Sequence, residues 1–302
     1  MRVFLTGGTG FLGSHVVRAL RRRGDECVVV SRSSSDPWND PGVRLVTADP
    51  TEAGPWQEEI GRCDAVVNLA GVLIVDPPHR WTSARKEALR ASRVNTTRHL
   101  VEAIRNAQRP PAVLLSQSAV GYYGQRGDEP LDETAAGGDD FLAKLAAKWE
   151  ATALEAAAVT RVAVARTGPV LGQGGGALAA MEPIFKVGLG GPWGDGSAWW
   201  SWIHLDDQVR LTLFVLDGTI EGPVNVTAPN PVTVDEFAKA LGKALGRPAI
   251  ARAPAFALRA ALGEAADALL HLQRVVPARA LAAGFEFRYP EVAAALATIY
   301  SG

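Results

Sequence analysis

The chain has 302 residues, of which 47% are hydrophobic, and its 31 basic and 32 acidic side chains give a formal net charge of −1. This length can bury a large core in one domain or in two coupled lobes, and we expect two. The balanced charge argues against nucleic acid and anionic membranes as partners, and we find no apolar run of the about 20 residues that cross a membrane. Cys27 and Cys63 do not have the spacing of a zinc site or a disulfide framework. A cytoplasmic location without a structural metal is therefore expected.

The first half of the chain alternates strand-like and helix-like segments. We expect strands near residues 2–6, 26–31, 43–47, 64–70, 112–116 and 161–166, and helices near 11–23, 82–107 and 140–158. Such alternation is typical of an α/β fold with a doubly wound parallel sheet of the Rossmann type.

The pattern changes after residue 170, where glycines gather at 172–176 and 188–196 and an alanine- and leucine-rich tail follows from Pro231. This predicts a smaller, interleaved and mainly helical C-terminal lobe. We expect residues 1–170 to form the cofactor-binding domain, with 200–226 returning to its sheet. Residues 171–199 and 227–302 then form the substrate lobe.

A glycine-rich turn, Thr6-Gly7-Gly8-Thr9-Gly10-Phe11-Leu12-Gly13, follows the first strand and opens the first helix. Glycines here let a pyrophosphate approach the backbone, where unpaired N–H groups and the positive end of the helix dipole face its charge. This strand-turn-helix context predicts dinucleotide binding by Gly7, Gly10, Phe11, Leu12 and Gly13.

The end of the second strand indicates which nicotinamide cofactor fits. An acidic residue there would hold the ribose hydroxyls, but the chain reads Val30-Ser31-Arg32-Ser33-Ser34. Arg32 and Ser33 can donate hydrogen bonds to a 2′-phosphate, which favours NADP(H) over NAD; the alternative for Arg32 is an ordinary solvated arginine. Asp49, after the third strand, is a candidate for the adenine amino group or a simple turn residue before Pro50.

Several motifs resemble those of the extended short-chain dehydrogenase/reductase superfamily, the group of sugar-nucleotide epimerases and dehydratases. They also occur along the chain in the same order as in that superfamily. They are the glycine turn, Asn68-Leu69-Ala70-Gly71, Asn95, residues 116–118, Arg166-Thr167-Gly168 and Trp202-Ile203-His204-Leu205-Asp206-Asp207. Residues 118–124, 199–204, 228–233 and 284–290 resemble more narrowly an atypical, epimerase-like subfamily with its own C-terminal domain. Its members are commonly labelled nucleoside-diphosphate-sugar epimerases. The resemblance implies further cofactor contacts at Leu69, Ala70, Gly71, Asn95 and Arg166.

The superfamily's chemistry implies a serine that binds the substrate oxygen, a tyrosine acid/base and a lysine four residues later. Ser118 matches the serine, although a local turn role is the alternative. No Tyr-x-x-x-Lys occurs in the chain. If Glu150 matches the acidic residue that often follows the lysine, the pair falls on Leu142 and Ala146, which cannot transfer a proton.

Other residues are candidates for the missing acid. Tyr122 and Tyr123 follow Ser118 closely, with Arg126 as a possible charge partner, but aromatic packing is the alternative for both. Lys144 and Lys148 lie on other faces of the same expected helix and fit a solvated surface.

The second lobe should define the substrate, and tryptophans are its most unusual feature. Stacked indoles suit a planar ring or a sugar, so we predict substrate contacts at Trp199, Trp200, Trp202 and His204. The alternatives are core packing for the tryptophans and a helix N-cap at Asp206 or Asp207.

Together these features predict an NADP(H)-binding oxidoreductase that acts on a small carbonyl or hydroxyl compound or on a sugar nucleotide. A sugar-nucleotide epimerase with transient oxidation is one alternative. A catalytically degenerate, NADP(H)-binding redox sensor or regulatory module is another, because the tyrosine and lysine are missing. A homodimer is a further expectation from the resemblance.

Overall fold

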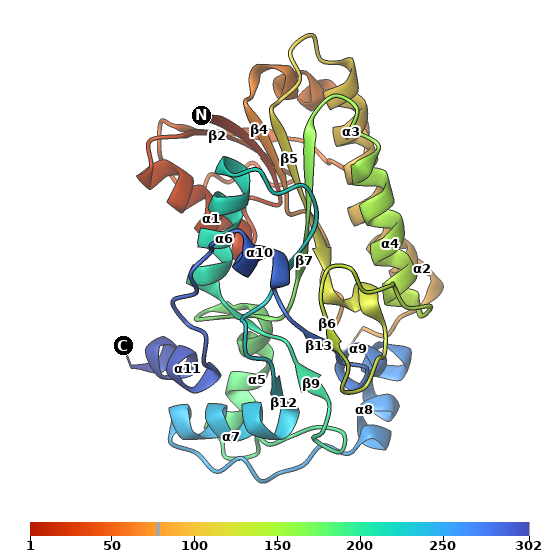
Figure 1. Ribbon diagram of the computed structural model, residues 1–302, viewed down its shortest axis with the longest axis vertical. Helices are drawn as coiled ribbons and strands as arrows, with labels where there is room; N and C mark the ends of the chain where they lie inside the picture. The colour runs from red at the N-terminus through yellow and green to blue at the C-terminus, as the bar shows by residue number, and fades with distance from the viewer. Residues whose placement is uncertain (77–78, 302) are drawn as a thin grey trace.

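The computed structural model describes residues 1–76 and 79–301, and its centre is a seven-stranded parallel sheet (Figure 1). The spatial order is β11-β7-β5-β4-β1-β2-β3. Because β1 is flanked by β2 on one side and β4 on the other, the order in which successive strands are added reverses beside β1, which is where ligands bind in such sheets. The strands are β1 (Arg2–Thr6), β2 (Glu26–Ser31), β3 (Val43–Thr47), β4 (Ala65–Asn68), β5 (Val113–Ala119), β7 (Arg161–Thr167) and β11 (Gly222–Val226).

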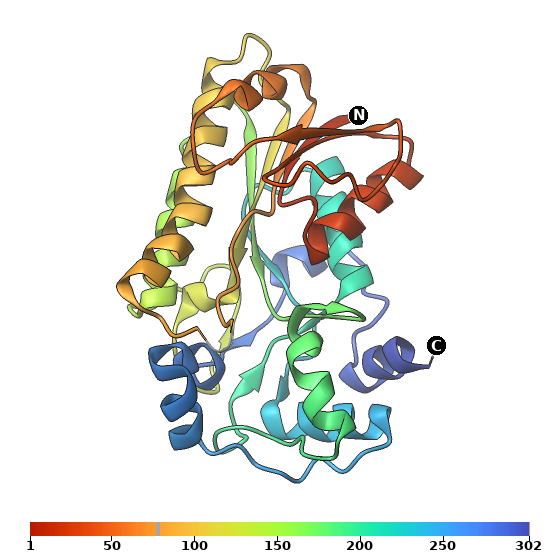
Figure 2. The ribbon, with the colours of Figure 1, turned by 180° about the vertical axis from the view of Figure 1, so that it is seen from behind.

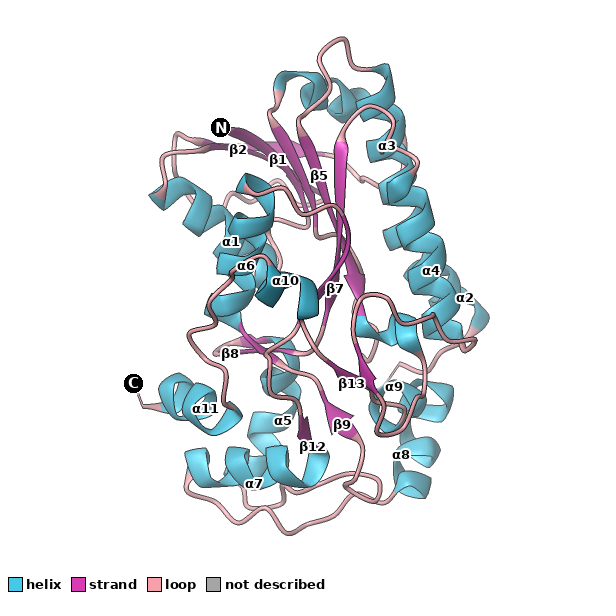
Figure 3. Cartoon of the chain, in the orientation of Figure 1, coloured by secondary structure: helices cyan, strands magenta, loops and turns pink. Residues whose placement is uncertain are grey.

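Helices cover both faces of this sheet, as expected for a doubly wound fold (Figure 3). One face packs on α1 (Phe11–Arg22), α6 (Leu205–Asp217) and α10 (Ala278–Ala282). The other packs on α3 (Thr96–Asn106), α4 (Phe141–Leu154) and the short η1 (Pro55–Arg62). Neighbouring strand residues point to opposite faces, so Leu5 enters the first core and Phe4 the second.

The helix expected over residues 82–107 is interrupted. It consists of α2 (Ser83–Arg90), a π-helical turn η2 (Ala91–Asn95) and α3. Such π turns widen a helix locally and are frequent at functional sites. Here the turn directs Arg93 inward, and only 9% of the surface of this residue is exposed to solvent.

The second lobe is mainly helical and lies below the sheet in Figures 1 and 2. Its core contains Trp193, Trp200, Trp202 and Phe237. Its helices are α5 (Gly176–Lys186), α7 (Val234–Leu245), α8 (Ala255–Leu262), η4 (Gly263–Ala266), α9 (Asp267–Leu270) and α11 (Val292–Tyr300). Its short strands are β6 (Pro130–Leu131), β8 (Val170–Gly172), β9 (Trp199–Trp200), β10 (Ile203–His204), β12 (Val232–Thr233) and β13 (Arg274–Val275), whereas the turn η3 (Val120–Tyr123) follows β5 and packs on α4.

The two lobes are interleaved, as the sequence predicted. After the first excursion α6 and β11 return, and β11 pairs with β7 at the edge of the sheet. The tail returns as well: Ala280 and Phe285 enter the core between the sheet, α1 and α6. Residues near 280–287 therefore belong physically to the first lobe rather than to the second. In the described part of the chain, no helix has the length and hydropathy of a membrane span.

Candidate functional site

The glycine turn after β1 is closed on two sides by backbone. Gly7 has φ of +68°, and a Cβ there would lie 2.7 Å from the carbonyl carbon of Leu69. A Cβ on Gly13 would overlap the carbonyl oxygen of Gly7. Both positions therefore require glycine for the fold of the turn itself.

Gly10 differs, because it is exposed and a Cβ there would meet only the Gly7 carbonyl oxygen at 3.3 Å. It is the N-cap of α1, no side chain caps the helix, and the first turn holds no acidic residue. The first N–H groups of α1 are thus available to an anion, and space exists in front of them. A pyrophosphate fits this turn.

Phe11 links the turn to the second lobe. Its ring occupies a cradle of three glycines: a Cβ on Gly172 would lie 3.0 Å from the ring, and one on Gly175 or Gly176 would overlap or crowd it. Leu12 packs beside Phe11 against the core shared with α1 and α6.

Arg32 follows β2 directly and is exposed. Its guanidinium forms no hydrogen bond or ion pair with any residue in the described ranges. Ser33 is exposed too, and its hydroxyl accepts a hydrogen bond from the backbone N–H of Ser35 at 3.1 Å. A cation and a hydroxyl therefore stand together at the end of β2, the position that a 2′-phosphate would require.

Asp49 lies near Arg32 but is already engaged. Its Oδ1 accepts hydrogen bonds from the backbone N–H and the hydroxyl of Thr51, at 2.9 and 2.7 Å. Burial opposes ionisation, but these hydrogen bonds and the charge of Arg32 outweigh it and lower the pKa of Asp49. Oδ2 is the oxygen with which Asp49 could reach a nucleotide base.

The end of β4 is held by a buried polar network. Asn68 accepts a hydrogen bond from the Thr6 hydroxyl at 2.7 Å and donates to the hydroxyls of Thr97 at 2.8 Å and Ser116 at 3.2 Å. The segment Leu69-Ala70-Gly71 leaves this anchor and runs from half-buried to exposed. Its backbone is thus fixed along the edge where the glycine turn lies.

Arg93, rather than Asn95, faces this segment. The amide oxygen of Asn95 accepts from Arg98 on its own helix. The guanidinium of Arg93 lies 3.1 Å from where a Gly71 Cβ would be, donates to the Val72 carbonyl oxygen at 2.9 Å, and stacks on Trp149. Among the described residues no carboxylate pairs with it, and burial, aided by the charge of Arg85, lowers the pKa of Arg93 to about 10.

Sequence reasoning missed Arg93. The helical pattern alone does not show which residue of 90–95 points inward, because the π turn shifts the register by one residue. The structure thus places a buried cation next to Gly71.

Ser118 is hydrogen-bonded to the buried ion pair of Glu150 and Arg166. Its hydroxyl donates to Glu150 Oε1 at 2.7 Å, and Arg166 donates to both oxygens of Glu150, at 2.9 and 2.8 Å. All three residues are at most 6% exposed. Burial opposes the charged form of Arg166, but the hydrogen bonds and charge of Glu150 raise its pKa above the ordinary value. The guanidinium of Arg166 thus faces the protein interior, which does not support the cofactor contact expected of it.

Tyr123 extends the same network. Its hydroxyl accepts from Arg166 at 3.0 Å and donates to Asn225 Oδ1 at 2.7 Å, and the residue is fully buried. Tyr122 is half-buried, and its ring stacks on the Arg166 guanidinium at 3.5 Å. Arg126 pairs with Glu129 rather than with either tyrosine hydroxyl. The packing role considered for the tyrosines therefore fits their surroundings better than acid/base chemistry does.

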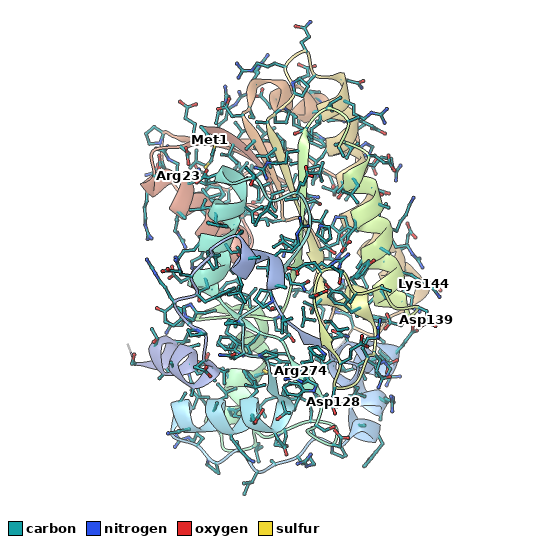
Figure 4. All side chains as sticks on the ribbon, in the orientation of Figure 1. Met1, Arg23, Asp128, Asp139, Lys144 and Arg274 are labelled. Atoms are coloured by element: carbon teal, nitrogen blue, oxygen red, sulfur yellow. The ribbon has the colours of Figure 1, made fainter. Side chains whose placement is uncertain are left out.

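The helix α4 offers no lysine to the interior. Leu142 is half-buried and Ala146 is buried, whereas Lys144 and Lys148 are exposed; Figure 4 shows Lys144 at the outer edge of the molecule. The positions that the resemblance assigns to the tyrosine and the lysine thus carry apolar side chains.

The tryptophans have different surroundings. Trp200 and Trp202 are 4% and 0% exposed and pack in the core of the second lobe, which does not support their expected place on a cleft wall. Trp199 is half-buried and donates to Asp128 Oδ1 at 2.7 Å, while Arg274 lies over its ring (Figure 4 labels Asp128 and Arg274). Trp199 is therefore the one of the three that borders solvent.

His204 is the N-cap of α6. Its Nδ1 accepts from the backbone N–H of Asp206 at 3.1 Å, and its ring stacks on Tyr289 at 3.8 Å. Burial lowers the pKa of His204 despite the nearby charges of Asp207 and Asp206. Asp207 is fully buried and accepts from the backbone N–H groups of Arg288 and Tyr289. The histidine, not an aspartate, caps the helix.

A cavity of about 110 Å³ lies where α4 begins. It is lined by Gly121 of η3, Leu142 of α4, and His271 with Gln273 of the C-terminal region. None of the predicted site residues lines it. Within residues 1–76 and 79–301 no cluster of three or more His, Cys, Asp or Glu side chains could hold a metal ion.

Known proteins resemble the chain over its whole length. Residues 3–227 match the model of the NAD dependent epimerase/dehydratase family, and residues 253–299 match a domain of unknown function, DUF1731. Epimerase family protein SDR39U1 of Mus musculus is 41% identical, with 98% of each chain covered. Its homolog in Arabidopsis thaliana, described as chloroplastic, is 43% identical over 99% of this chain and 86% of the relative.

Among solved structures, human epimerase family protein SDR39U1 (isoform 2) with NADPH has a TM-score of 0.90 and 37% identity, with 100% of both chains covered. MoeE5 in complex with UDP-glucuronic acid and NAD has a TM-score of 0.80 at 23% identity, covering 100% of this chain and 98% of the other, and shows only the shared fold. The sheet order, the glycine turn and these matches lead to one conclusion: the chain belongs to the NAD dependent epimerase/dehydratase family and carries a DUF1731 domain at its C-terminal end.

Proposed function

We propose that this protein binds NADP(H) along the carboxyl edge of its sheet and acts as an oxidoreductase of the short-chain dehydrogenase/reductase type. The observation that carries the proposal is the pairing of an open Gly10 at the start of α1 with an exposed, unpaired Arg32, within the described residues, at the end of β2. The first takes the pyrophosphate and the second takes the 2′-phosphate. The human relative solved with NADPH supports the same choice of cofactor.

The remaining cofactor contacts follow from the same edge. Ser33 supports the 2′-phosphate, Asp49 reaches the adenine through Oδ2, and the backbone of Leu69 to Gly71 supports the rest of the dinucleotide. Bound NADP(H) supplies the hydride, and the protein supplies orientation and charge. Arg93 places a buried positive charge beside Gly71.

A catalytically degenerate redox sensor is the second candidate. One observation favours it: the hydroxyls of Ser118 and Tyr123 are both engaged in the buried network around Arg166. A sensor needs only a binding surface that differs between NADP⁺ and NADPH, whereas an enzyme needs a proton donor near the nicotinamide. A homodimer and a cytoplasmic location stay predictions from the sequence.

Calorimetric titration with NADPH and NADH tests the cofactor assignment. Native protein should prefer NADPH, and Arg32→Ala should weaken NADPH binding about 10- to 100-fold with little effect on NADH, since a hydrogen bond to a charged group contributes about 1.5–3 kcal/mol. Arg22→Ala is the matched control, because Arg22 is also exposed but lies at the far end of α1. Equal affinity of the native protein for both nucleotides would contradict the proposal.

A further inference from the structure

The cavity at the start of α4 brings together parts of the chain that are distant in sequence. Gly121 comes from the turn that follows β5, Leu142 from the first turn of α4, and His271 from the DUF1731 domain. A second, wider hollow of about 460 Å³ shares Asp140 and His271 with it and extends toward Arg126. His271 thus stands where an open hollow meets a narrower one.

The narrow cavity lies at the place where the family's acid/base would be expected. Leu142 occupies the position that the resemblance gives to the tyrosine, and a Cβ on Gly121 would be 3.5 Å from its Cβ. An apolar side chain at this position cannot donate a proton. His271 lines the same cavity from the opposite lobe.

His271 is held in place by its own segment. Gln273 donates from Nε2 to the carbonyl oxygen of His271 at 2.6 Å, and the Ser201 hydroxyl donates to the carbonyl oxygen of Gln273 at 2.6 Å. The next residues form β13, which pairs with β6. The imidazole keeps 28% of its side-chain surface exposed, and its Nε2 lies 3.8 Å from Asp267 Oδ1. The backbone of His271 is thus anchored, and its imidazole is partly exposed beside a carboxylate.

Charge in the narrow cavity is predominantly negative. Its ionisable lining consists of Asp140, Glu264, Asp267 and His271, without lysine or arginine among the described lining residues. Nearby cations are already paired: Lys86 with Glu264 at 2.6 Å, Arg259 with Asp267 at 3.4 Å, and Arg126 of the wider hollow with Glu129 at 2.9 Å. A diphosphate would find no unpaired cation here, whereas Trp81 and Phe141 give an apolar wall.

We propose that His271 is the proton donor and acceptor for the reaction, and that the substrate in this cavity is an uncharged or cationic carbonyl compound with an apolar group rather than a sugar nucleotide. In reduction, a hydride from NADPH adds to the carbonyl carbon, and the imidazolium gives its proton to the carbonyl oxygen. The C=O double bond becomes C–OH, NADPH becomes NADP⁺, and His271 is left neutral. Asp267 Oδ1, 3.8 Å from Nε2, places a negative charge beside the ring. This inference rests on the proposed function.

The first test uses binding. In NMR spectra of the isotope-labelled full chain saturated with NADP⁺, the His271 imidazole signals are assigned by their loss in His271→Gln. Benzaldehyde, as a neutral aromatic probe, should shift the His271 signals, and UDP-glucose should not. If the His271 signals do not shift with benzaldehyde, or shift equally with UDP-glucose, the proposed class of uncharged or cationic carbonyl substrates is overturned.

The second test uses the rate of NADPH oxidation with benzaldehyde. Loss of a general acid lowers kcat about 100-fold or more, so His271→Gln should be at least that slow, while its affinity for NADPH by calorimetry stays native. His99→Gln on α3 is the matched control and should keep the native rate; His271→Asn serves if His271→Gln does not fold. A native protein that does not reduce benzaldehyde, or a His271→Gln rate within threefold of native, overturns the acid role. Failure of the native protein to bind NADPH would instead contradict the proposed function, and the benzaldehyde shift can still be read without cofactor.

Discussion

The glycine turn and the network around Arg166 lie at the same edge of the same sheet. The polar groups of the turn are open to a ligand, whereas those of the network are paired with one another. The turn leaves the first N–H groups of α1 without a side-chain partner among the described residues, and the space in front of them at Gly10 is open. The network pairs the polar atoms of Ser118, Glu150 and Arg166 with one another and hides them from solvent. Only the first is available to a ligand. Residue type suggests a catalytic role, whereas the availability of the polar atoms to a ligand decides it.

The largest effect is expected from breaking the network. Glu150→Gln leaves the buried Arg166 charge without its partner, and removal of one member of a buried ion pair costs about 3–5 kcal/mol of unfolding free energy. Urea unfolding measures this loss. Glu155→Gln, at the exposed end of the same helix, should change the unfolding free energy by less than about 0.5 kcal/mol. A small loss in Glu150→Gln would mean that the network is not structural.

The glycine turn can be separated into its structural and binding parts. Gly13→Ala should lower the unfolding free energy by about 1–3 kcal/mol, because the new Cβ overlaps the Gly7 carbonyl oxygen. Gly10→Ala should leave stability within about 0.5 kcal/mol of native and weaken NADPH binding instead, since its Cβ enters the space for the pyrophosphate. Unfolding curves and NADPH calorimetry on both variants check the contrast. Equal behaviour of the two variants would remove the distinction.

The smallest effect concerns the outer end of the network. Tyr123→Phe removes the hydroxyl between Arg166 and Asn225, at a cost of about 1–2 kcal/mol. Burial, only partly offset by Arg166 and Asn225, raises the pKa of Tyr123. Its contribution to stability is therefore complete below the unfolded tyrosine pKa of about 10 and declines as the pH rises through the folded value.

Unfolding at about pH 8 and about pH 11 tests this sign. The native protein should lose more stability between the two than Tyr123→Phe does, because other tyrosines, such as Tyr300, titrate equally in both proteins. An identical loss in both proteins would show that Tyr123 does not carry the effect.

The sequence predicted the architecture well because strands and turns depend on local pattern. Six of the seven sheet strands lie where expected, within a few residues at each end. Residues 200–226 were expected to return to the sheet, but β11 itself was not placed within them, since Gly222 and Pro223 open it with little apolar signal. The π turn at Ala91–Asn95 was missed because its hydrophobic spacing differs little from that of a continuous helix.

The candidate site was predictable only where it depends on backbone. Glycine spacing determines the turn at Gly7 to Gly13, so the sequence alone indicates it. The Ser118 hydroxyl is hydrogen-bonded to a partner 32 residues away in the sequence. The Tyr123 hydroxyl is hydrogen-bonded to partners 43 and 102 residues away. Such pairings follow from the packing of the whole sheet, and a motif read along the chain does not contain them.

The three glycines around Phe11 limit which substitutions this sequence can accept. A large ring at position 11 and a side chain at position 175 compete for the same volume, so they are mutually exclusive in this fold. The two sites lie more than half the chain apart and belong to different lobes, yet a side chain added at position 175 demands a smaller residue at position 11. Substitutions at these two positions are therefore expected to occur together in related sequences, so that the glycine turn and the second lobe vary as a matched pair.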